Sequence, residues 1–120
     1  MKCVRLSDVE SSPSGMPCSS REGDHAAGIV RKVLLGEHEL PGSVRLSHAL
    51  LAPGQSVAEH SHDDLFEVFY VLGGQGVLMV NGKSLAIAAG SCFVVEPGEL
   101  HALGNDGSGD LTLIYFGLFA

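Results

Sequence analysis

The chain has 120 residues, which is enough for one domain with a single core and too few for a second domain of normal size. Its net charge of −7 argues against a nucleic-acid partner, because phosphate neutralisation needs clustered Lys and Arg and the 7 basic residues are scattered. Charged residues make up 18%, below the roughly 25% of an ordinary soluble domain, so we expect a second copy of the chain to cover part of the surface, as in a homodimer.

The sequence also bears on compartment. The amino terminus has no apolar run of signal-peptide length, and the longest apolar stretch, LTLIYFGLFA, is too short to cross a bilayer as a helix. Cys3, Cys18 and Cys92 are odd in number and form no CxxC pair, which argues against a disulfide framework and a cysteine zinc site. These features predict a cytoplasmic protein with no membrane partner.

Residues 1–28 are predicted to form an irregular N-terminal arm, since 11–28 are small, polar and rich in turn formers. From residue 29 onward, short apolar runs alternate with turn residues, and no sustained helical period is present. Strands are predicted at 29–35, 43–51, 67–72, 77–80, 83–88, 91–96, 100–104 and 111–119. Asn81-Gly82 marks a hairpin. Strands recurring about every 8 to 12 residues are typical of a sandwich or barrel, so 29–120 are predicted to form one all-β domain.

The predicted strand 43–51 alternates between two faces. The more apolar face carries Val44, Leu46, His48 and Leu50, and the other carries Arg45, Ser47 and Ala49. The apolar face is expected to point inward, so His48 is a candidate pocket residue, with a satisfied core histidine as the competing interpretation. Arg45 and Lys83 are expected at the surface.

The stretch AEHSHDDLFE contains His60 and His62, in a chain with only 6 histidines. Alternate residues of a strand point to one face, so two imidazoles at this spacing can converge on one ion. Glu67 opens the next predicted strand, and an antiparallel neighbour can bring its carboxylate to the same point. On these residues alone, a metal site and a solvated loop containing Asp63 and Asp64 are equally good interpretations.

The spacing of these residues resembles the two motifs of the cupin superfamily over about residues 29–119. The first motif, G-x5-H-x-H-x3–4-E-x6-G, is matched by Gly54, His60, His62, Glu67 and Gly74. The second motif, G-x5-P-x-G-x2-H-x3-N, is matched by Gly90, Gly98, His101 and Asn105. The second motif departs at one position, where Glu96 stands in place of the usual proline and Pro97 follows, which leaves the shape of this turn open.

The resemblance implies a single-domain cupin jelly-roll barrel (double-stranded β-helix) whose metal ligands are His60, His62, Glu67 and His101. It implies one divalent transition metal per chain, and a donor set without thiolate favours Fe, Mn, Ni, Co or Zn. Four protein ligands leave two positions of a six-coordinate ion open to a small molecule. Because every ligand type is present, the resemblance argues against a metal-free storage-type cupin.

Three further residues are predicted to line the pocket. Phe69 and Val71 share the face of Glu67 by alternation, and Leu103 shares the face of His101. None of the three is basic, which favours a small uncharged or singly charged substrate such as a keto acid, sugar acid or diol, anchored mainly by the metal. The implied function is a mononuclear metalloenzyme of the isomerase, lyase, decarboxylase or dioxygenase type. The alternative is a non-catalytic module that binds or senses a small ligand around a structural metal.

Overall fold

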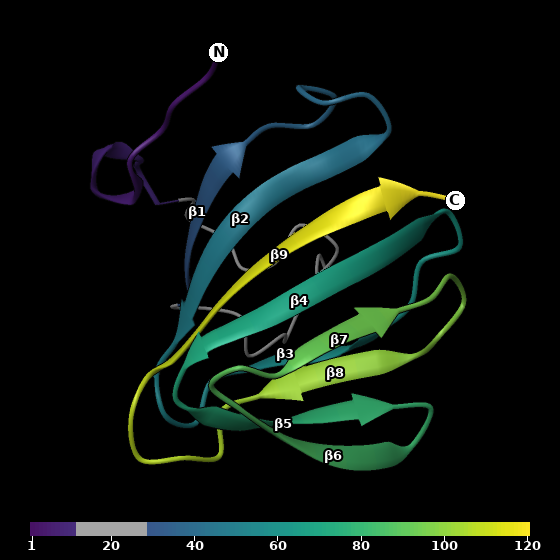
Figure 1. Ribbon diagram of the computed structural model, residues 1–120. Coiled ribbons are helices and arrows are strands. Elements are labelled where there is room, and N and C mark those ends of the chain that lie inside the picture. Colours follow the sequence, from purple (N-terminus) through teal and green to yellow (C-terminus); the bar gives the residue numbers. More distant parts are fainter. Residues whose placement is uncertain (12–28) are drawn as a thin grey trace.

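The computed structural model describes residues 1–11 and 29–120, and nine strands make up most of it (Figure 1). They are Val30–Leu35 (β1), Ser43–Leu51 (β2), Ser56–His60 (β3), Leu65–Gly73 (β4), Gln75–Val80 (β5), Lys83–Ala88 (β6), Cys92–Val95 (β7), His101–Gly104 (β8) and Leu111–Phe119 (β9). One sheet has the order β1-β2-β9-β4-β7, and the other has the order β3-β8-β5-β6. The prediction of an all-β jelly roll is confirmed.

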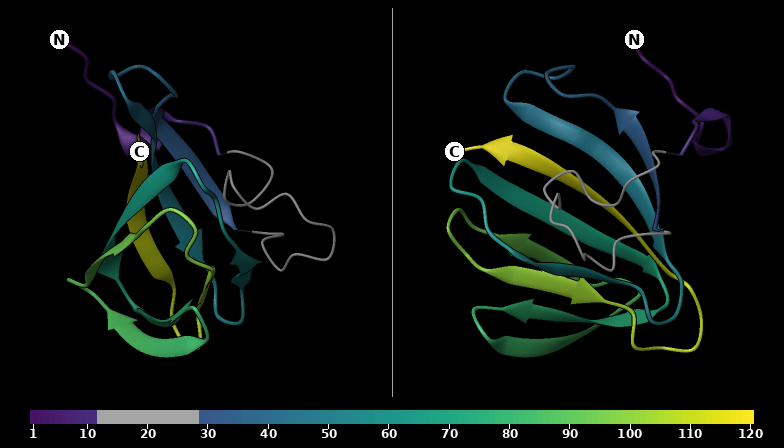
Figure 2. Two further views of the ribbon diagram at one scale, coloured as in Figure 1. Left: turned by 90° about the vertical axis from the view of Figure 1, so that its right-hand side faces the viewer. Right: turned by 180° about the vertical axis from the view of Figure 1, so that it is seen from behind.

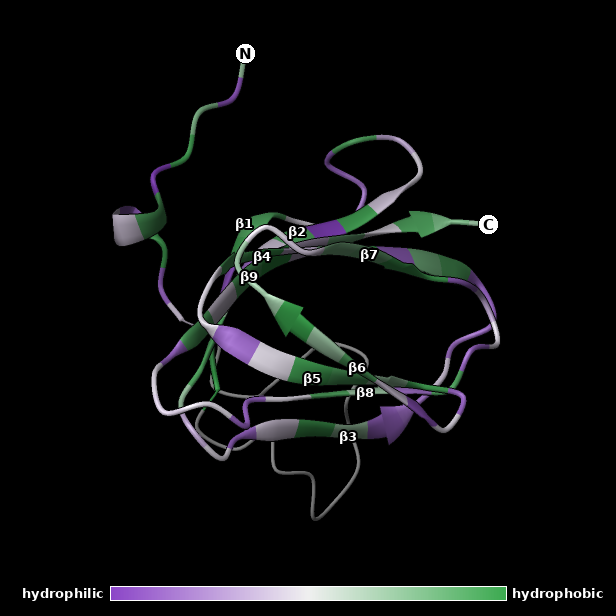
Figure 3. Ribbon diagram, turned by 60° about the horizontal axis from the view of Figure 1, so that its bottom comes forward, coloured by the Kyte–Doolittle hydropathy of each residue, from purple (hydrophilic) through white to green (hydrophobic). Residues whose placement is uncertain are grey.

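The two sheets face each other as two layers, which Figures 2 and 3 show from several sides. Among the described residues, all backbone ladders are antiparallel and each lies within one sheet. The sheets therefore meet through side chains and do not close into a continuous barrel, which corrects that part of the predicted architecture.

The eight predicted strands are all present, with ends within two residues of the predicted ones, and the hairpin at Asn81-Gly82 joins β5 to β6. Strand β3 was not among the strands predicted from apolar runs, because its sequence SVAEH carries one large apolar residue and two charged or ionisable ones. Within the predicted arm, Leu6–Asp8 form one turn of 3-10 helix, while 12–28, including Cys18, lie outside the described residues. No helix in the part of the chain that the structure describes is long and apolar enough to span a bilayer.

Val44 points inward as predicted, but from Arg45 onward the inner face of β2 is the opposite of the predicted one. The buried residues that follow Arg45 on the inner face are Ser47, Ala49 and Leu51. The half-buried residues of the outer face are Leu46, His48 and Leu50. The more apolar face was expected to point inward, and this expectation fails because the outer face of the five-stranded sheet is itself apolar.

Aromatic rings form a ladder across the inner face of the five-stranded sheet. Strand pairing places Phe69 of β4 between Tyr115 of β9 and Phe93 of β7. The ring of Phe69 stacks on both neighbours, with centroid distances of 5.4 Å to Tyr115 and 4.7 Å to Phe93. Each such pair contributes about 0.5–1.5 kcal/mol beyond its buried area. The ladder gives the inner face a rigid surface next to the row that carries Glu67.

Candidate metal centre

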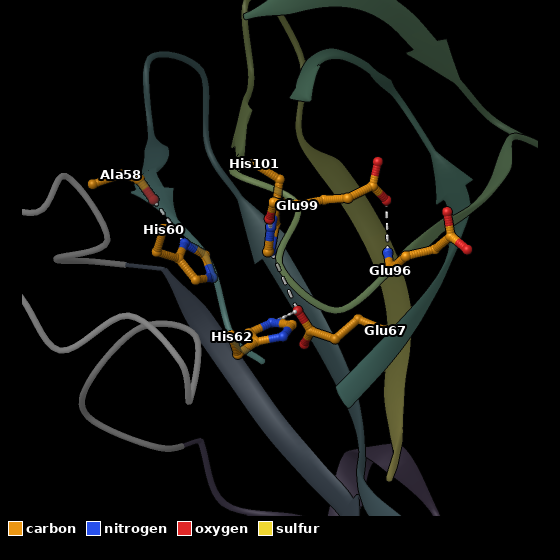
Figure 4. Close-up of polar contacts among 7 residues, drawn as sticks. All are labelled: Ala58, His60, His62, Glu67, Glu96, Glu99 and His101. Carbon is orange, nitrogen blue, oxygen red and sulfur yellow. Dashed lines mark hydrogen bonds and ion pairs between the residues drawn. The ribbon is translucent and has the colours of Figure 1, made fainter. Parts of the chain in front are cut away.

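Four potential ligands meet between the two sheets (Figure 4). His60 ends β3 and His101 begins β8, and the two residues are paired across the four-stranded sheet. Glu67 comes from β4 of the opposite sheet, and His62 comes from the loop after β3. One ligand atom of each residue lies within 4.8 Å of those of the other three. The fold thus brings together the four residues that the cupin resemblance singled out.

His62 reaches the cluster from a loop, whereas the sequence analysis placed it with His60 on one face of a strand. Strand β3 ends at His60, and the ring centroids of the two histidines lie 5.9 Å apart. The loop is fixed by the N–H of Gly98, which donates to the carbonyl of His62 at 2.8 Å. A glycine of the second motif therefore positions a histidine of the first.

The turn that precedes β8 explains the departure from the second motif. Pro97 followed by Gly98, whose φ is +83°, is the pattern of a type II turn, and the N–H of Glu99 donates to the carbonyl of Glu96 at 3.1 Å. The N–H of Glu96 donates to the Glu99 carboxylate at 2.7 Å, a bond that the usual proline could not make. The turn is intact, and His101 keeps its place after it.

Backbone carbonyls orient two of the imidazoles. Nδ1 of His60 lies 2.8 Å from the carbonyl oxygen of Ala58, and Nδ1 of His101 lies 2.9 Å from that of Glu99. A carbonyl oxygen only accepts, so each Nδ1 carries a proton, and in the neutral ring Nε2 keeps its lone pair. This arrangement is typical of histidines that bind metal through Nε2.

Glu67 is the electrostatic centre of the cluster. Its Oε1 lies 2.7 Å from Nε2 of His62 and 3.4 Å from Nε2 of His101. Burial raises the pKa of Glu67, but the adjacent imidazoles of His101 and His62 outweigh this effect, and the pKa falls below its ordinary value. Burial lowers the pKa of His101, yet the contact with Glu67 brings that pKa above its ordinary value. These two shifts favour the ionised form of Glu67 and the protonated form of His101.

The pKa of His60 moves the other way, because burial disfavours its charged form. A neutral imidazole is the form that binds a metal ion. His60, Glu67 and His101 are each at most 7% exposed, so this donor set is held away from bulk water. Three neutral imidazoles and one carboxylate fit a divalent transition metal.

A cavity of about 240 Å³ opens beside the cluster. His62 and Glu67 line it, together with Tyr115, Gly117, Val44 and Arg45. Gly117 is paired with both Val44 and Glu67, so these residues form one row across β2, β9 and β4. Because Gly117 has no side chain, the middle of this row stays open.

The predicted pocket residues lie elsewhere. Phe69, Val71 and Leu103 point inward as expected, but they are buried in the hydrophobic core. His48 is half-buried on the outer face of β2 and is paired with Lys32 of β1, and burial lowers its pKa. As far as the structure describes the chain, the walls of the cavity include none of these residues. Lys83 is exposed, as predicted.

Sequence reasoning missed two cavity residues as site residues. Tyr115 was not singled out in the sequence analysis, although Leu111, Leu113, Tyr115 and Gly117 alternate onto one inward face of the strand, and this face ends at a glycine. Arg45 was placed at the surface, which is wrong, because it lines the cavity. The available signal was strand alternation, which puts Arg45 on the same face as Ser47 and Ala49, whose small side chains suit a packed interior.

Asn105, the last residue of the second motif, has a structural role. It is 3% exposed, and its Nδ2 donates to the carbonyls of Leu51 and Gly109, both at 2.8 Å. Its Oδ1 accepts from the N–H of Gly107 at 2.9 Å. The side chain thus ties the 105–110 loop to the end of β2.

Known proteins with similar sequences agree with this architecture. A family model of the cupin domain matches residues 47–117. An oxalate-binding protein of Thermotoga maritima is 38% identical over 82 residues, which are 68% of this chain and 68% of that protein. The tetracenomycin polyketide synthase protein TcmJ of Streptomyces glaucescens is 25% identical over 118 aligned positions, covering 83% of this chain and 79% of that protein.

Solved structures show the same fold. A crystal structure from Thermotoga maritima, described as that of a predicted oxalate decarboxylase, matches with a TM-score of 0.87 and 28% identity, covering 99% of this chain and 100% of that chain. The polyketide cyclase RemF of Streptomyces resistomycificus matches with a TM-score of 0.76 and 19% identity, covering 98% of this chain and 79% of that chain. The second likeness concerns the fold alone.

Proposed function

The chain belongs to the cupin family, and on that basis we propose that it is a metal-dependent cupin that binds a small oxygen-rich acid, with oxalate as the first candidate. One divalent transition metal per chain is held by His60, His62, Glu67 and His101. The observation that carries the proposal is the buried cluster of three imidazoles and one carboxylate beside a small cavity.

The chemistry of the cluster supports this assignment. Imidazole and carboxylate donors without thiolate suit Fe, Mn, Ni, Co or Zn. The hydrogen bonds from Nδ1 of His60 and His101 to backbone carbonyls leave each Nε2 for a ligand bond. When bound, the metal supplies Lewis-acid chemistry toward the oxygens of the acid.

The class of ligand follows from the cavity and from the relatives. A cavity of about 240 Å³ suits a molecule of a few heavy atoms. One relative is named an oxalate-binding protein, and one similar structure is described as a predicted oxalate decarboxylase. The expectation of an uncharged or singly charged ligand rested on the lack of a basic pocket residue, and Arg45 removes that premise.

Turnover of the bound acid is the second candidate function. It is favoured by Glu37 and Asp64, two carboxyl side chains on the cavity wall that can exchange a proton with a bound acid. The reaction to test is the decarboxylation of hydrogen oxalate to formate and carbon dioxide, in which the C–C bond breaks and the acid proton moves from oxygen to the carbon of formate. Binding without turnover is the alternative.

The test begins with protein purified without chelator. Elemental analysis is expected to give about one transition-metal ion per chain, as the four-ligand cluster implies. Titration calorimetry is then expected to show oxalate binding to the metal-loaded protein and none after chelator treatment. Formate release separates the enzyme from the binding protein. A protein that takes up no transition metal would refute the proposal.

We also propose that a second copy of the chain covers the outer face of the five-stranded sheet. Large apolar side chains that are 42% to 53% exposed there are Val30, Tyr70, Leu72, Val94 and Leu118. The outer face of an antiparallel sheet that meets water normally carries polar residues. An apolar outer face supports a homodimer, in which both copies bury the same surface.

The proposed compartment is the cytoplasm. Cys3 and Cys92, the cysteines within the described residues, are free and exposed. Exposed free thiols suit a reducing compartment better than an oxidising one.

A further inference from the structure

The cavity beside the cluster contains a cationic side chain that plays no part in binding a metal. Arg45 lines this cavity together with His62 and Glu67, and its side chain is 34% exposed. Its ion partner among the described residues is Glu37, whose Oε2 lies 3.8 Å from Nη2 of Arg45. Nε of Arg45 is buried, with no hydrogen-bond partner in the described parts of the chain. A guanidinium has five N–H donors, so much of this group is left for a ligand.

The backbone of β2 directs Arg45 toward the cavity. From Val44 to Ser47, β2 advances three residues while its partner β9 advances two, from Gly117 to Tyr115. The extra residue makes a bulge, a feature that re-aims side chains next to binding sites. Arg45 comes directly after Val44, which is paired with Gly117, and Gly117 is paired in turn with Glu67. Neighbouring strands lie about 4.8 Å apart, so these residues are close together in the sheet. The guanidinium and the cluster therefore face one small cavity.

We propose that Arg45 is the carboxylate-binding residue of this site and forms a bidentate pair with the carboxylate of an acid that occupies the metal centre. The inference rests on the proposed function and narrows the class of ligand that the site binds. A guanidinium fork matches a carboxylate and has no counterpart in a diol, so the ligand is a short dicarboxylate or a 2-oxo acid.

The ion pair with Glu37 does not by itself explain Arg45. A pair of partly exposed side chains 3.8 Å apart contributes little to stability. Glu37 also lines the cavity, so an incoming carboxylate competes with it for the guanidinium. The two interpretations differ in what they predict for Glu37→Gln. Removal of a competitor strengthens binding of the acid, whereas loss of a structural ion pair does not.

The experiment uses the full chain loaded with metal and two probes. Oxalate carries carboxylates, whereas acetohydroxamate binds metals through two oxygens and has none. Arg45→Gln is expected to weaken oxalate binding about tenfold or more, the loss typical of a hydrogen bond to a charged group, and to change acetohydroxamate binding less than about twofold. Glu37→Gln is expected to strengthen oxalate binding. Arg5→Gln, the same substitution at an exposed residue near the amino terminus, is expected to change neither.

Metal content and thermal unfolding are measured for every variant before binding. If Arg45→Gln does not fold, Arg45→Lys keeps the charge without the fork and is expected to weaken oxalate binding selectively. If the Arg45 variant binds oxalate with unchanged affinity, or binds both probes equally more weakly, the assignment of Arg45 is wrong. Neither result would contradict the metal site. A metal-loaded wild-type protein that binds neither probe would overturn the proposed function itself, and this inference with it.

Discussion

The two histidines paired across β3 and β8 are oriented in the same way. In each case Nδ1 bonds to the carbonyl two residues earlier in the chain, that of Ala58 for His60 and that of Glu99 for His101. Both bonds are made to the protein's own backbone, so the fold sets the direction of each Nε2. A site oriented in this way binds without first ordering its ligands.

Removal of one ligand tests this site directly. His60→Ala and His101→Ala are each expected to weaken metal binding by roughly 100- to 1,000-fold, since a four-ligand site that binds with about 10–16 kcal/mol gains about 2.5–4 kcal/mol from each ligand. Competition with a chromophoric chelator measures the change. His48→Ala serves as the control, since His48 lies half-buried on the outer face of β2 and its loss should leave affinity unchanged. Full metal affinity in both ligand variants would contradict the assignment.

The raised pKa of His101 predicts how metal binding depends on pH. A metal ion binds the neutral imidazole, so it must displace the proton that Glu67 stabilises on His101. Because that pKa lies above the ordinary 6.5, the proton persists above pH 6.5, and apparent metal affinity should continue to rise with pH there. Calorimetry in buffers of different ionisation enthalpy should detect proton release. Constant affinity between about pH 6 and 8 would contradict this account.

At the scale of the elements, the turn after β4 explains the last glycine of the first motif. Gly74 has a φ of +85°, and a Cβ at this position would lie 2.2 Å from the carbonyl oxygen of Asp110. Gly74→Ala is therefore expected to cost more than about 2 kcal/mol of unfolding free energy, from strain and overpacking. Denaturant unfolding measures this cost.

Gly109→Ala is the matched control, because a Cβ at Gly109 meets nothing within 4 Å and its φ needs no glycine. The control should change stability by no more than about 0.5 kcal/mol. Equal effects of the two substitutions would show that the turn is not constrained in this way.

Strand positions were more predictable from the sequence than strand faces. Strands 29–35 through 111–119 stand out because apolar runs and turn residues alternate sharply. β3 could not be found in this way, since Glu59 and His60 break its apolar pattern. The face of β2 was misassigned because alternation gives two sets of residues but not which set is buried, and here both faces meet apolar surroundings. The misplacement of Arg45 is a direct result.

The ligand set was predictable for a different reason. His60, His62 and Glu67 lie close together in the sequence, but they form one cluster with the distant His101 only because β3, β8 and β4 come together in the fold. The local sequence pattern does not show which strands meet. On His60, His62 and Glu67 alone, a solvated polar loop was as good an interpretation as a metal site. The spacing of two motifs supplied the long-range information. Arg45 and Tyr115 lie outside those motifs, so their place on the cavity wall could be found only from the structure.

At the scale of the whole molecule, the apolar outer face predicts assembly. Light scattering is expected to give twice the chain mass of 12.5 kDa at micromolar concentration. Leu72→Glu and Val94→Glu put charge on the outer face of the five-stranded sheet and should shift the protein toward monomer. Leu85→Glu is the control, because Leu85 is 54% exposed on β6 of the other sheet. Three variants with the same mass as the wild type would refute the proposed interface.

The two tyrosines lie on opposite faces of one sheet. Tyr115 is 2% exposed and lines the cavity, whereas Tyr70 is 42% exposed on the outer face. The chain has no tryptophan, so these two phenol rings dominate its near-ultraviolet absorption and emission. The protein therefore carries one natural optical reporter on each face. With Tyr70→Phe, the remaining emission should follow occupation of the cavity, and with Tyr115→Phe it should follow association of the chains.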